Sequence, residues 1–456
     1  MADHAHPDNH ATPLLYAPSV MRKVFATFDE PDMTSDGGCI ILRQAMQHGS
    51  LIDRLADAIN DSRSSAHVSH SVRDMLAQRI GQICLGYEDA NDCDHMREDW
   101  AIQLLADQHR PLASQPTMTR LENRVTQDDL ANMEAAIMTN FLDSYTAVPK
   151  CLVIDMDPSA IRTYGQQELS LYNTHIGGYC LMPFHVYEGL SGKLITTIIR
   201  EGKTPTADEI IPLLERIVRA IRSRFPKATL IFRADSHHTK PAVMDYMARH
   251  NIRFVTGLST NARLKKLIAT EVAAAEAVYE RRKMVSKYRR FHSFRYKADS
   301  WSEQRRVVAR IEVGPFGTDV RFVVTDLPSS SSKALYQIYC GRGEAELYIK
   351  AHKCLNSERS SCQAATANQF RLLLHSAAYA IMHSFRATAL AGTKWAKASF
   401  STIRCRLFKL AARVESGKTY LRLHFSEKVD PSIKAIFARV SALHVALTNA
   451  GHPQPG

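Results

Sequence analysis

The spacing of the apolar residues changes at Lys150, and this change constrains the fold more than any other feature of the 456-residue chain. Before it, from residue 17 to about 125, apolar residues recur at helical spacing, as in Leu42–Ile59 and Val72–Leu85. After it come short apolar runs of strand length, bounded by turn residues. We therefore expect a helical N-terminal region followed by an α/β region.

Residues 151–258 predict the order β-β-β-α-β-α-β. The expected strands are Cys151–Asp155, Tyr179–Tyr187, Leu194–Arg200, Thr229–Arg233 and Phe254–Leu258, and the expected helices are Ala207–Phe225 and Pro241–His250. Hairpins come first and helical crossovers later, which favours a mixed sheet flanked by helices.

The stretch from about 259 to 326 interrupts this order. It predicts a helix over Leu264–Tyr279 and a β-hairpin of Arg306–Glu312 with Val320–Thr325. Between Arg281 and Arg310 lie eleven Lys or Arg against only Asp299 and Glu303. We read the stretch as an α+β insertion, followed by helices to about residue 415. The expected regions are 1–125 (helical and DNA-binding), 126–258 (first part of the core), 259–326 (insertion) and 327–456 (second part of the core and basic C-terminal helices).

Charge and composition narrow the class of partner. Lys and Arg number 58 against 46 Asp and Glu, giving a net charge of +12, which favours a polyanion such as nucleic acid or an acidic membrane face. No apolar stretch reaches the roughly 18 residues of a membrane span, and the N-terminus lacks the apolar core of a secretory signal. Nine cysteines without a CxxC pair favour reduced thiols, and so the cytoplasm, over disulfides or a zinc ribbon.

Acidic residues follow two of the expected strands. Asp155 and Asp157 end the first and would share one face, and a buried pair of carboxylates needs a cation or another partner. Asp235 directly follows the fourth strand, where sites of α/β sheets collect. The alternatives are a surface turn at Asp157 and a helix N-cap at Asp235. We interpret His237 and His238 as surface residues.

A third acid lies in a basic stripe. Tyr339, Arg342, Glu346, Lys350 and Lys353 step by three or four residues, so on a helix they would share one face. The cations would keep Glu346 ionised and could grip phosphate. An exposed helix with ordinary ion pairs is the alternative. Three carboxylates together would suit Mg²⁺, and two such ions support phosphodiester chemistry.

The same residues resemble a known family. Tyr339, Arg342, Glu346 and Lys353 match the Y-(2)-R-(3)-E-(6)-K signature of the insertion-sequence-4-like DDE transposases. Other stretches are similar to the insertion-sequence-1380 family of bacterial transposases. These are Asp155–Ser159, Tyr164–Glu168, Arg233–Ser236, Leu85–Asp89, Leu112–Thr117 and Ala367–Arg371.

The resemblance implies a ribonuclease-H-like catalytic fold that cuts element ends and joins the freed 3′-hydroxyl to target DNA. It implies a metal-binding triad of Asp157, Asp235 and Glu346 for two Mg²⁺ ions, with Mn²⁺ as a substitute. Asp155 is either a neighbouring acid or the true ligand. Tyr339, Arg342 and Lys353, with Lys350 on the same stripe, would contact DNA near the scissile phosphate. The expected partners are the terminal inverted repeats, target DNA and a second copy of the chain, and no membrane.

Two rival functions remain open at this point. One is a metal-dependent nuclease of the same fold without strand transfer. The other is a non-catalytic DNA-binding protein, against which the presence of all three acids weighs.

Overall fold

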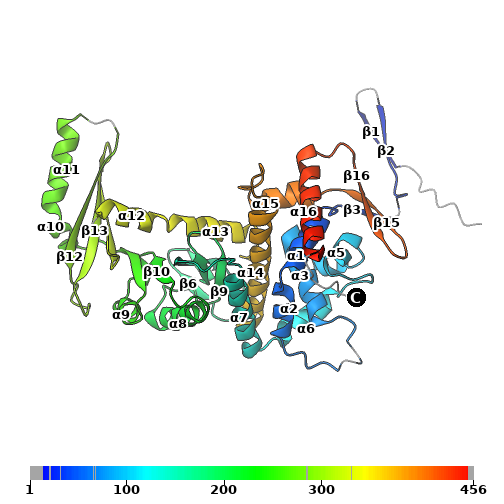
Figure 1. The fold of residues 1–456 in the computed structure, drawn as a ribbon, viewed down its shortest axis with the longest axis horizontal. Helices are drawn as coiled ribbons and strands as arrows, with labels where there is room; N and C mark the ends of the chain where they lie inside the picture. The colour runs from blue at the N-terminus through cyan, green and yellow to red at the C-terminus, as the bar shows by residue number, and fades with distance from the viewer. Residues whose placement is uncertain are drawn as a thin grey trace, which may run out of the picture.

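The computed structural model describes residues 14–19, 22–30, 32–64, 66, 68–283, 286–329 and 331–449. A mixed eight-stranded sheet forms the centre of one half of the molecule, and a helical body forms the other half (Figure 1). The long helix α14 (Ala365–Thr388) stands between the two halves (Figure 1).

The sheet is the predicted mixed sheet with three further strands. In spatial order its strands are β12 (Tyr288–Tyr296), β13 (Arg305–Gly314), β14 (Gly317–Thr325), β11 (Arg253–Leu258), β10 (Thr229–Ala234), β4 (Cys151–Pro158), β8 (Phe184–Glu188) and β9 (Leu194–Ile198). Strands β4, β10 and β11 are parallel, and every other pairing is antiparallel. All five strands expected between residues 151 and 258 are present.

Helices cover both faces of the sheet. On one face α7 (Gln127–Asp143), α8 (Ala207–Arg224) and α9 (Pro241–Arg249) pack with the apolar side chains of β4, β8 and β10. On the other face lie α12 (Ser332–Cys340), α13 (Gly343–Lys353) and α14. Side chains alternate along β4, so Ile154 and Met156 enter the first layer while Asp155 and Asp157 face the second.

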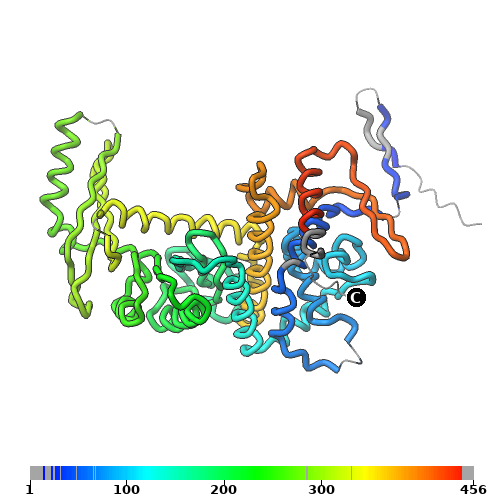
Figure 2. The backbone as a smooth tube through the Cα atoms, in the orientation of Figure 1, coloured from blue at the N-terminus to red at the C-terminus, as the bar shows by residue number. Residues whose placement is uncertain are grey.

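The insertion extends the main sheet. Helices α10 (Ala262–Leu267) and α11 (Ala269–Arg281) precede the three strands, and α11 packs on β12 and β13. The predicted hairpin is β13 and β14, and β14 pairs with β11. Strand β12 was not predicted, because its nine residues lie within the basic stretch and mix charged with aromatic side chains. The insertion projects at one end of the molecule (Figure 2).

A small sheet lies next to the core. It consists of β5 (Ile161–Arg162), β7 (Gly178–Leu181) and β6 (Leu171–Asn173). The expected single strand Tyr179–Tyr187 is divided between β7 and β8. Pro183 stands at the division, where its missing N–H cannot continue a ladder.

The helical body is built from both ends of the chain. Its helices are α1 (Cys39–His48), α2 (Leu51–Asp57), α3 (Val72–Leu85), α4 (Asp92–Met96), α5 (Trp100–Leu105), α6 (Gln115–Arg124), α15 (Phe400–Ile403), the π-helical turn η3 (Arg404–Phe408) and α16 (Pro431–Asn449). Among the described residues, no helix has both the length and the apolar character that a membrane span requires.

Two expectations about this region are wrong. The chain is not helical from residue 17, because β1 (Leu14–Ser19), β2 (Arg22–Ala26) and β3 (Met33–Thr34) precede α1. Nor do helices alone form the C-terminal part, since β15 (Ala412–Ser416) and β16 (Leu421–Phe425) form a hairpin. Strand β3 pairs with β15, a contact between distant segments that local patterns do not reveal.

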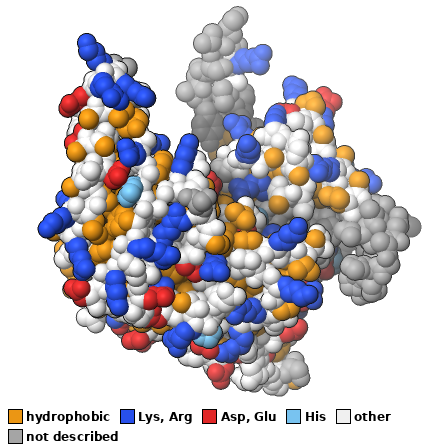
Figure 3. Space-filling model, turned by 60° about the vertical axis from the view of Figure 1, so that its left-hand side comes forward, with side chains coloured by type: hydrophobic (Ala, Val, Ile, Leu, Met, Phe, Trp, Pro, Cys, Tyr) orange, Lys and Arg blue, Asp and Glu red, His pale blue; other side chains and the backbone are white. Residues whose placement is uncertain are grey.

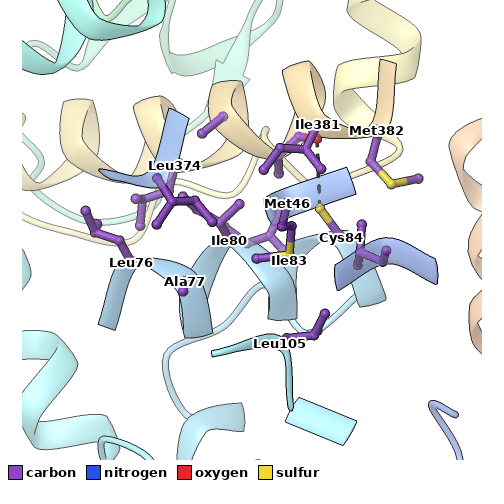
Figure 4. Close-up of a cluster of buried hydrophobic side chains, with 14 of the residues drawn as sticks. Met46, Leu76, Ala77, Ile80, Ile83, Cys84, Leu105, Leu374, Ile381 and Met382 are labelled. Carbon is purple, nitrogen blue, oxygen red and sulfur yellow. Dashed lines mark hydrogen bonds between the residues drawn. The ribbon is translucent and has the colours of Figure 1, made fainter. Parts of the chain in front are cut away.

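Helix α14 joins the two halves through buried contacts on both of its sides. On one side Leu374, Ile381 and Met382 pack with residues of α1, α3 and α5, and the Cys84 thiol donates to the carbonyl of Ala378 (Figure 4). On the other side Gln369 accepts a hydrogen bond from the N–H of Ile199 and donates one to the carbonyl of Thr197. Thr197 lies within the edge strand β9, and Ile199 directly follows it. The helix thereby covers a sheet edge that would otherwise be open to other chains.

We expect Ile80→Ala to lower the free energy of unfolding by about 2–5 kcal/mol, because it leaves a cavity beneath α14 where Ile80 is fully buried. Denaturant titration followed by circular dichroism measures the loss. Leu267→Ala is the control, since Leu267 is 52% exposed and its loss is expected to cost no more than about 0.5 kcal/mol. Equal effects would contradict the assignment of this core.

Candidate active site

The three acids predicted to meet are brought to one face of the sheet. Asp157 lies near the end of β4, and Asp235 directly follows β10, the parallel neighbour of β4. Glu346 lies in the first turn of α13, which packs over β4 and β8. The carboxyl ends of neighbouring parallel strands meet at one sheet edge, so this placement follows from the topology.

Arg342 lies between two of the acids. Its Nη1 is 3.2 Å from Oδ2 of Asp157, and its Nη2 is 2.7 Å from Oε1 of Glu346. The Asp157 side chain is 15% exposed and that of Glu346 is 60% exposed, so the pair spans the boundary between the core and the solvent. The guanidinium thus ties helix α13 to strand β4.

The pKa of Asp157 depends on its burial and on the charges of the other two acids. Burial, together with the negative charges of Asp235 and Glu346, raises its pKa to about 7, against the opposing charge of Arg342. All three carboxylates therefore act on one region. A carboxyl group in this position gains most from a cation placed beside it.

Asp235 is held by the two histidines that follow it. The backbone N–H of His237 donates to its Oδ1, and the ring Nδ1 atoms of His237 and His238 each lie 2.9 Å from a carboxylate oxygen. Burial alone would raise the pKa of Asp235, but the hydrogen bond from His238 and the charges of both histidines hold it well below its ordinary value. His238 lies in the short 3-10 helix η2 (Ser236–His238) and is fully buried, so its interpretation as a surface residue is wrong.

Asp155 has a different environment. It is fully buried and pairs through both oxygens with Arg233, at 2.6 Å from Nε and from Nη2. The two residues are register partners on β4 and β10. Arg233 also donates to the carbonyl of Ile338 in α12. Burial raises the pKa of Asp155 to about 6, against the hydrogen bond and charge of Arg233.

Two glycines make room for this buried pair. A Cβ atom at Gly189 would overlap the Asp155 carboxylate, and one at Gly341 would overlap the Arg233 guanidinium. Both residues therefore have to be glycine for a packing reason. Asp155 thus serves the connection between sheet and helix, and Asp157 is the acid that faces Asp235 and Glu346.

The signature residues divide over two helices. Tyr339 is on α12, Arg342 is at the start of α13, and Glu346, Lys350 and Lys353 are within α13. The predicted single stripe is thus interrupted at Gly341, although α12 and α13 follow one another over the sheet (Figure 1). Tyr339 lies over Gly257, where an added Cβ would be 2.8 Å from its Oη. Lys353 pairs with Glu358 at 3.1 Å.

The donor chemistry of the site fits a divalent cation. Carboxylate oxygens are the ligands that Mg²⁺ and Mn²⁺ prefer, and the guanidinium of Arg342 already lies between two of them as a positive charge. Within the described residues, no three His, Cys, Asp or Glu side chains are gathered closely enough to hold a metal as they stand. Asp157, Asp235 and Glu346 are the residues that would hold such an ion, and Arg342 now pairs with two of them.

Comparison with known proteins identifies the family of the chain. The sequence matches the family described as transposase DDE domain, group 1, over residues 17–445. The chain belongs to this family of DDE transposases. It is therefore a DNA transposase enzyme, and DDE transposases generally act with divalent metal ions. No curated protein sequence matches the chain.

The chain is also similar to a solved structure. It is a "piggyBac transposase synaptic complex with hairpin DNA", with a TM-score of 0.43 and 11% sequence identity. The match covers 82% of this transposase and 80% of that chain.

We expect Asp155→Ala and Asp157→Ala to differ in stability. Asp155→Ala leaves Arg233 buried without its partner, and the free energy of unfolding should fall by about 3–5 kcal/mol. Asp157→Ala removes a carboxylate crowded by two others, and the change should stay below about 1 kcal/mol. Denaturant titration of the two variants measures this. Equal losses would show that both acids are structural.

Proposed function

We propose that this transposase cleaves DNA at the ends of an insertion element and joins the freed 3′-hydroxyl to target DNA. Two divalent ions, Mg²⁺ with Mn²⁺ as a substitute, would be held by Asp157, Asp235 and Glu346. The observation that carries the proposal is that Arg342 pairs with both Asp157 and Glu346, and that the charge of Asp235 acts on Asp157. The bound ions would activate the attacking oxygen and stabilise the leaving oxygen.

The chain's own residues would prepare this site. His237 and His238 hold the Asp235 carboxylate in one orientation and keep it ionised. Arg342 neutralises Asp157 and Glu346 in the free protein, and would turn to the DNA phosphate once cations take over that role. Tyr339, Lys350 and Lys353 would contact the backbone on either side of the cut.

The strand order supports a ribonuclease-H-like core. Counted from β4, the five central strands have the spatial order 3-2-1-4-5, with the first three antiparallel and the fourth and fifth parallel to the first. We assign the chain to the insertion-sequence-1380 family on its local segments. Its partners would be terminal inverted repeats, target DNA and a second protomer. Nine free cysteines are compatible with the reducing cytoplasm.

Glu346→Ala should lower excision from a plasmid by more than about 100-fold, because even groups that only support metal ligands are worth about 10- to 100-fold. Binding to element-end DNA should persist. Glu344→Ala is the matched control, since Glu344 is an exposed acid in the same turn of α13. Unchanged products from Glu346→Ala would favour a non-catalytic DNA-binding protein, and cleavage without joined products would favour a nuclease.

Asp157→Cys separates metal binding from other roles of this acid. A thiolate is a softer ligand than a carboxylate, so Mn²⁺ should restore more cleavage than Mg²⁺ does. Asp155→Cys should show no such metal preference. An equal response of both variants to Mn²⁺ would argue against Asp157 as a ligand.

The basic end of the insertion is expected to bind DNA through phosphates. Arg281, Arg282 and Lys283 are exposed at the end of α11, with no carboxylate partner among the described residues, and Lys and Arg side chains cover the projecting end of the insertion (Figure 3). Replacing all three with Ala should reduce the slope of log K against log salt by about 0.9 for each lost phosphate contact, equally for all sequences. Arg219→Ala with Lys227→Ala, on and after α8, is the control. An unchanged slope would exclude this surface.

A further inference from the structure

Four segments that resemble the insertion-sequence-1380 family, but contain none of the three acids, meet at one place in the structure. They are 85–89, 112–117, 164–168 and 367–371. Gln167 bonds with Ser360 through both ends of its amide, at 3.1 and 2.9 Å, and the Glu168 N–H donates to the carbonyl of Gln363. Arg371 pairs with Glu122 at 3.0 Å. Asp89, Gln115, Gln166 and Arg371, one from each segment, line a common cavity, so the four segments lie together.

Residues of these segments line two adjoining cavities, which we call together the distal cavity. The first has a volume of about 730 Å³ and the second about 970 Å³. Asp89, Ser361 and Arg371 line both cavities, so the two are neighbours.

The first cavity adjoins the active site. Ala160 lines it and follows Asp157 by three residues. Lys353, at the end of the helix that carries Glu346, lines it too. DNA held at the three acids would thus have its neighbouring nucleotides beside this cavity.

The rim of the first cavity offers a surface for a nucleotide base. Tyr164 at this rim is 80% exposed, and an exposed ring is a stacking surface for bases. Arg162 is also exposed and has no carboxylate partner among the described residues. Two acids of the lining, Glu88 and Glu358, pair with Arg359 and Lys353 of the same lining.

The second cavity carries groups that read base edges. Asn91, Asn123 and Gln166 line it, and their side-chain amides make no hydrogen bond among the described residues. Asn and Gln can donate to and accept from one base at the same time, and a carboxylate accepts from an exocyclic amino group.

Two buried atoms also lack partners. Nδ1 of His375, which lines the first cavity, and Oε1 of Glu122, which lines the second, have no hydrogen-bond partner in the described part of the chain. Their side chains are 4% and 3% exposed. Buried polar atoms without partners are costly, so these two atoms favour a polar occupant.

We propose that the distal cavity binds unpaired bases of the DNA strand next to the scissile phosphate, with Tyr164 stacking on a base and Gln166 and its neighbours reading base edges. This inference rests on the proposed function, since that function places DNA at the three acids. It assigns to the four segments a role in recognition that is separate from the cutting step.

Binding of the full chain to two labelled DNA probes tests the proposal. One probe is a blunt duplex of an element end, and the other is the same duplex with a short single-stranded extension. Fluorescence anisotropy should show that Tyr164→Ala weakens binding of the extended probe about tenfold, a stacking contribution for one base, while binding of the blunt duplex is unchanged. An extension of abasic sugars should bind wild type as weakly as Tyr164→Ala binds the normal extension.

Tyr172→Ala is the matched control, because Tyr172 lies on β6 of the small sheet whose strand β5 ends two residues before Tyr164, is 59% exposed and does not line either cavity. Equal weakening by Tyr164→Ala and Tyr172→Ala, or full binding of the abasic extension, would overturn the proposal. Plasmid excision by the wild type is measured in parallel. Excision with no base-dependent binding defeats the cavity assignment alone, whereas absence of cleavage and joining defeats the proposed function.

Discussion

The ion pairs of Arg342 with Asp157 and Glu346 are the interaction on which the geometry of the site depends. Burial of Asp157 raises the pKa of its carboxyl group, and the charges of Asp235 and Glu346 add to this increase. The guanidinium between Asp157 and Glu346 opposes the increase and fixes a helix on a strand 185 residues away in sequence. Under the proposed function, a bound cation would take over the charge that this guanidinium now supplies to Asp157 and Glu346.

A second buried pair supports the first. Asp155 and Arg233 join two neighbouring strands, and Arg233 reaches on to the carbonyl of Ile338 near the end of α12. Helix α12 leads directly to Arg342, so the position of the guanidinium in the site is set by a contact beneath it. The glycines at 189 and 341 allow that contact, because any side chain there would displace it. Asp155 thus connects strands β4 and β10 through Arg233, whereas Asp157 is influenced by the charges of Asp235 and Glu346.

The sequence was sufficient to predict the central sheet and to place Asp157 and Asp235 at the ends of two of its strands. Apolar runs such as Thr229–Arg233 are short and bounded by turn residues, and this pattern depends on local structure alone. Contacts between distant segments were not predictable in this way. The pairing of β3 with β15 and the position of β12 at the sheet edge both depend on tertiary structure. The roles of Asp155 and His238 also followed only from their partners in the structure, because the identity of an acid or a histidine does not tell whether its side chain is buried.

Helix α13 links the two parts of the proposed mechanism. Its first turn carries Glu346, opposite Asp157, and its last residue, Lys353, lines the distal cavity. An eleven-residue helix is stiff, so the distance between the cut and the recognised bases would be fixed by its length. The helix is held at its start by Arg342 and along its buried side by Ile349 and His352. Any change that moved α13 would shift Glu346 and Lys353 together, so under the two proposals the recognition of the DNA end would be coupled to the position of Glu346.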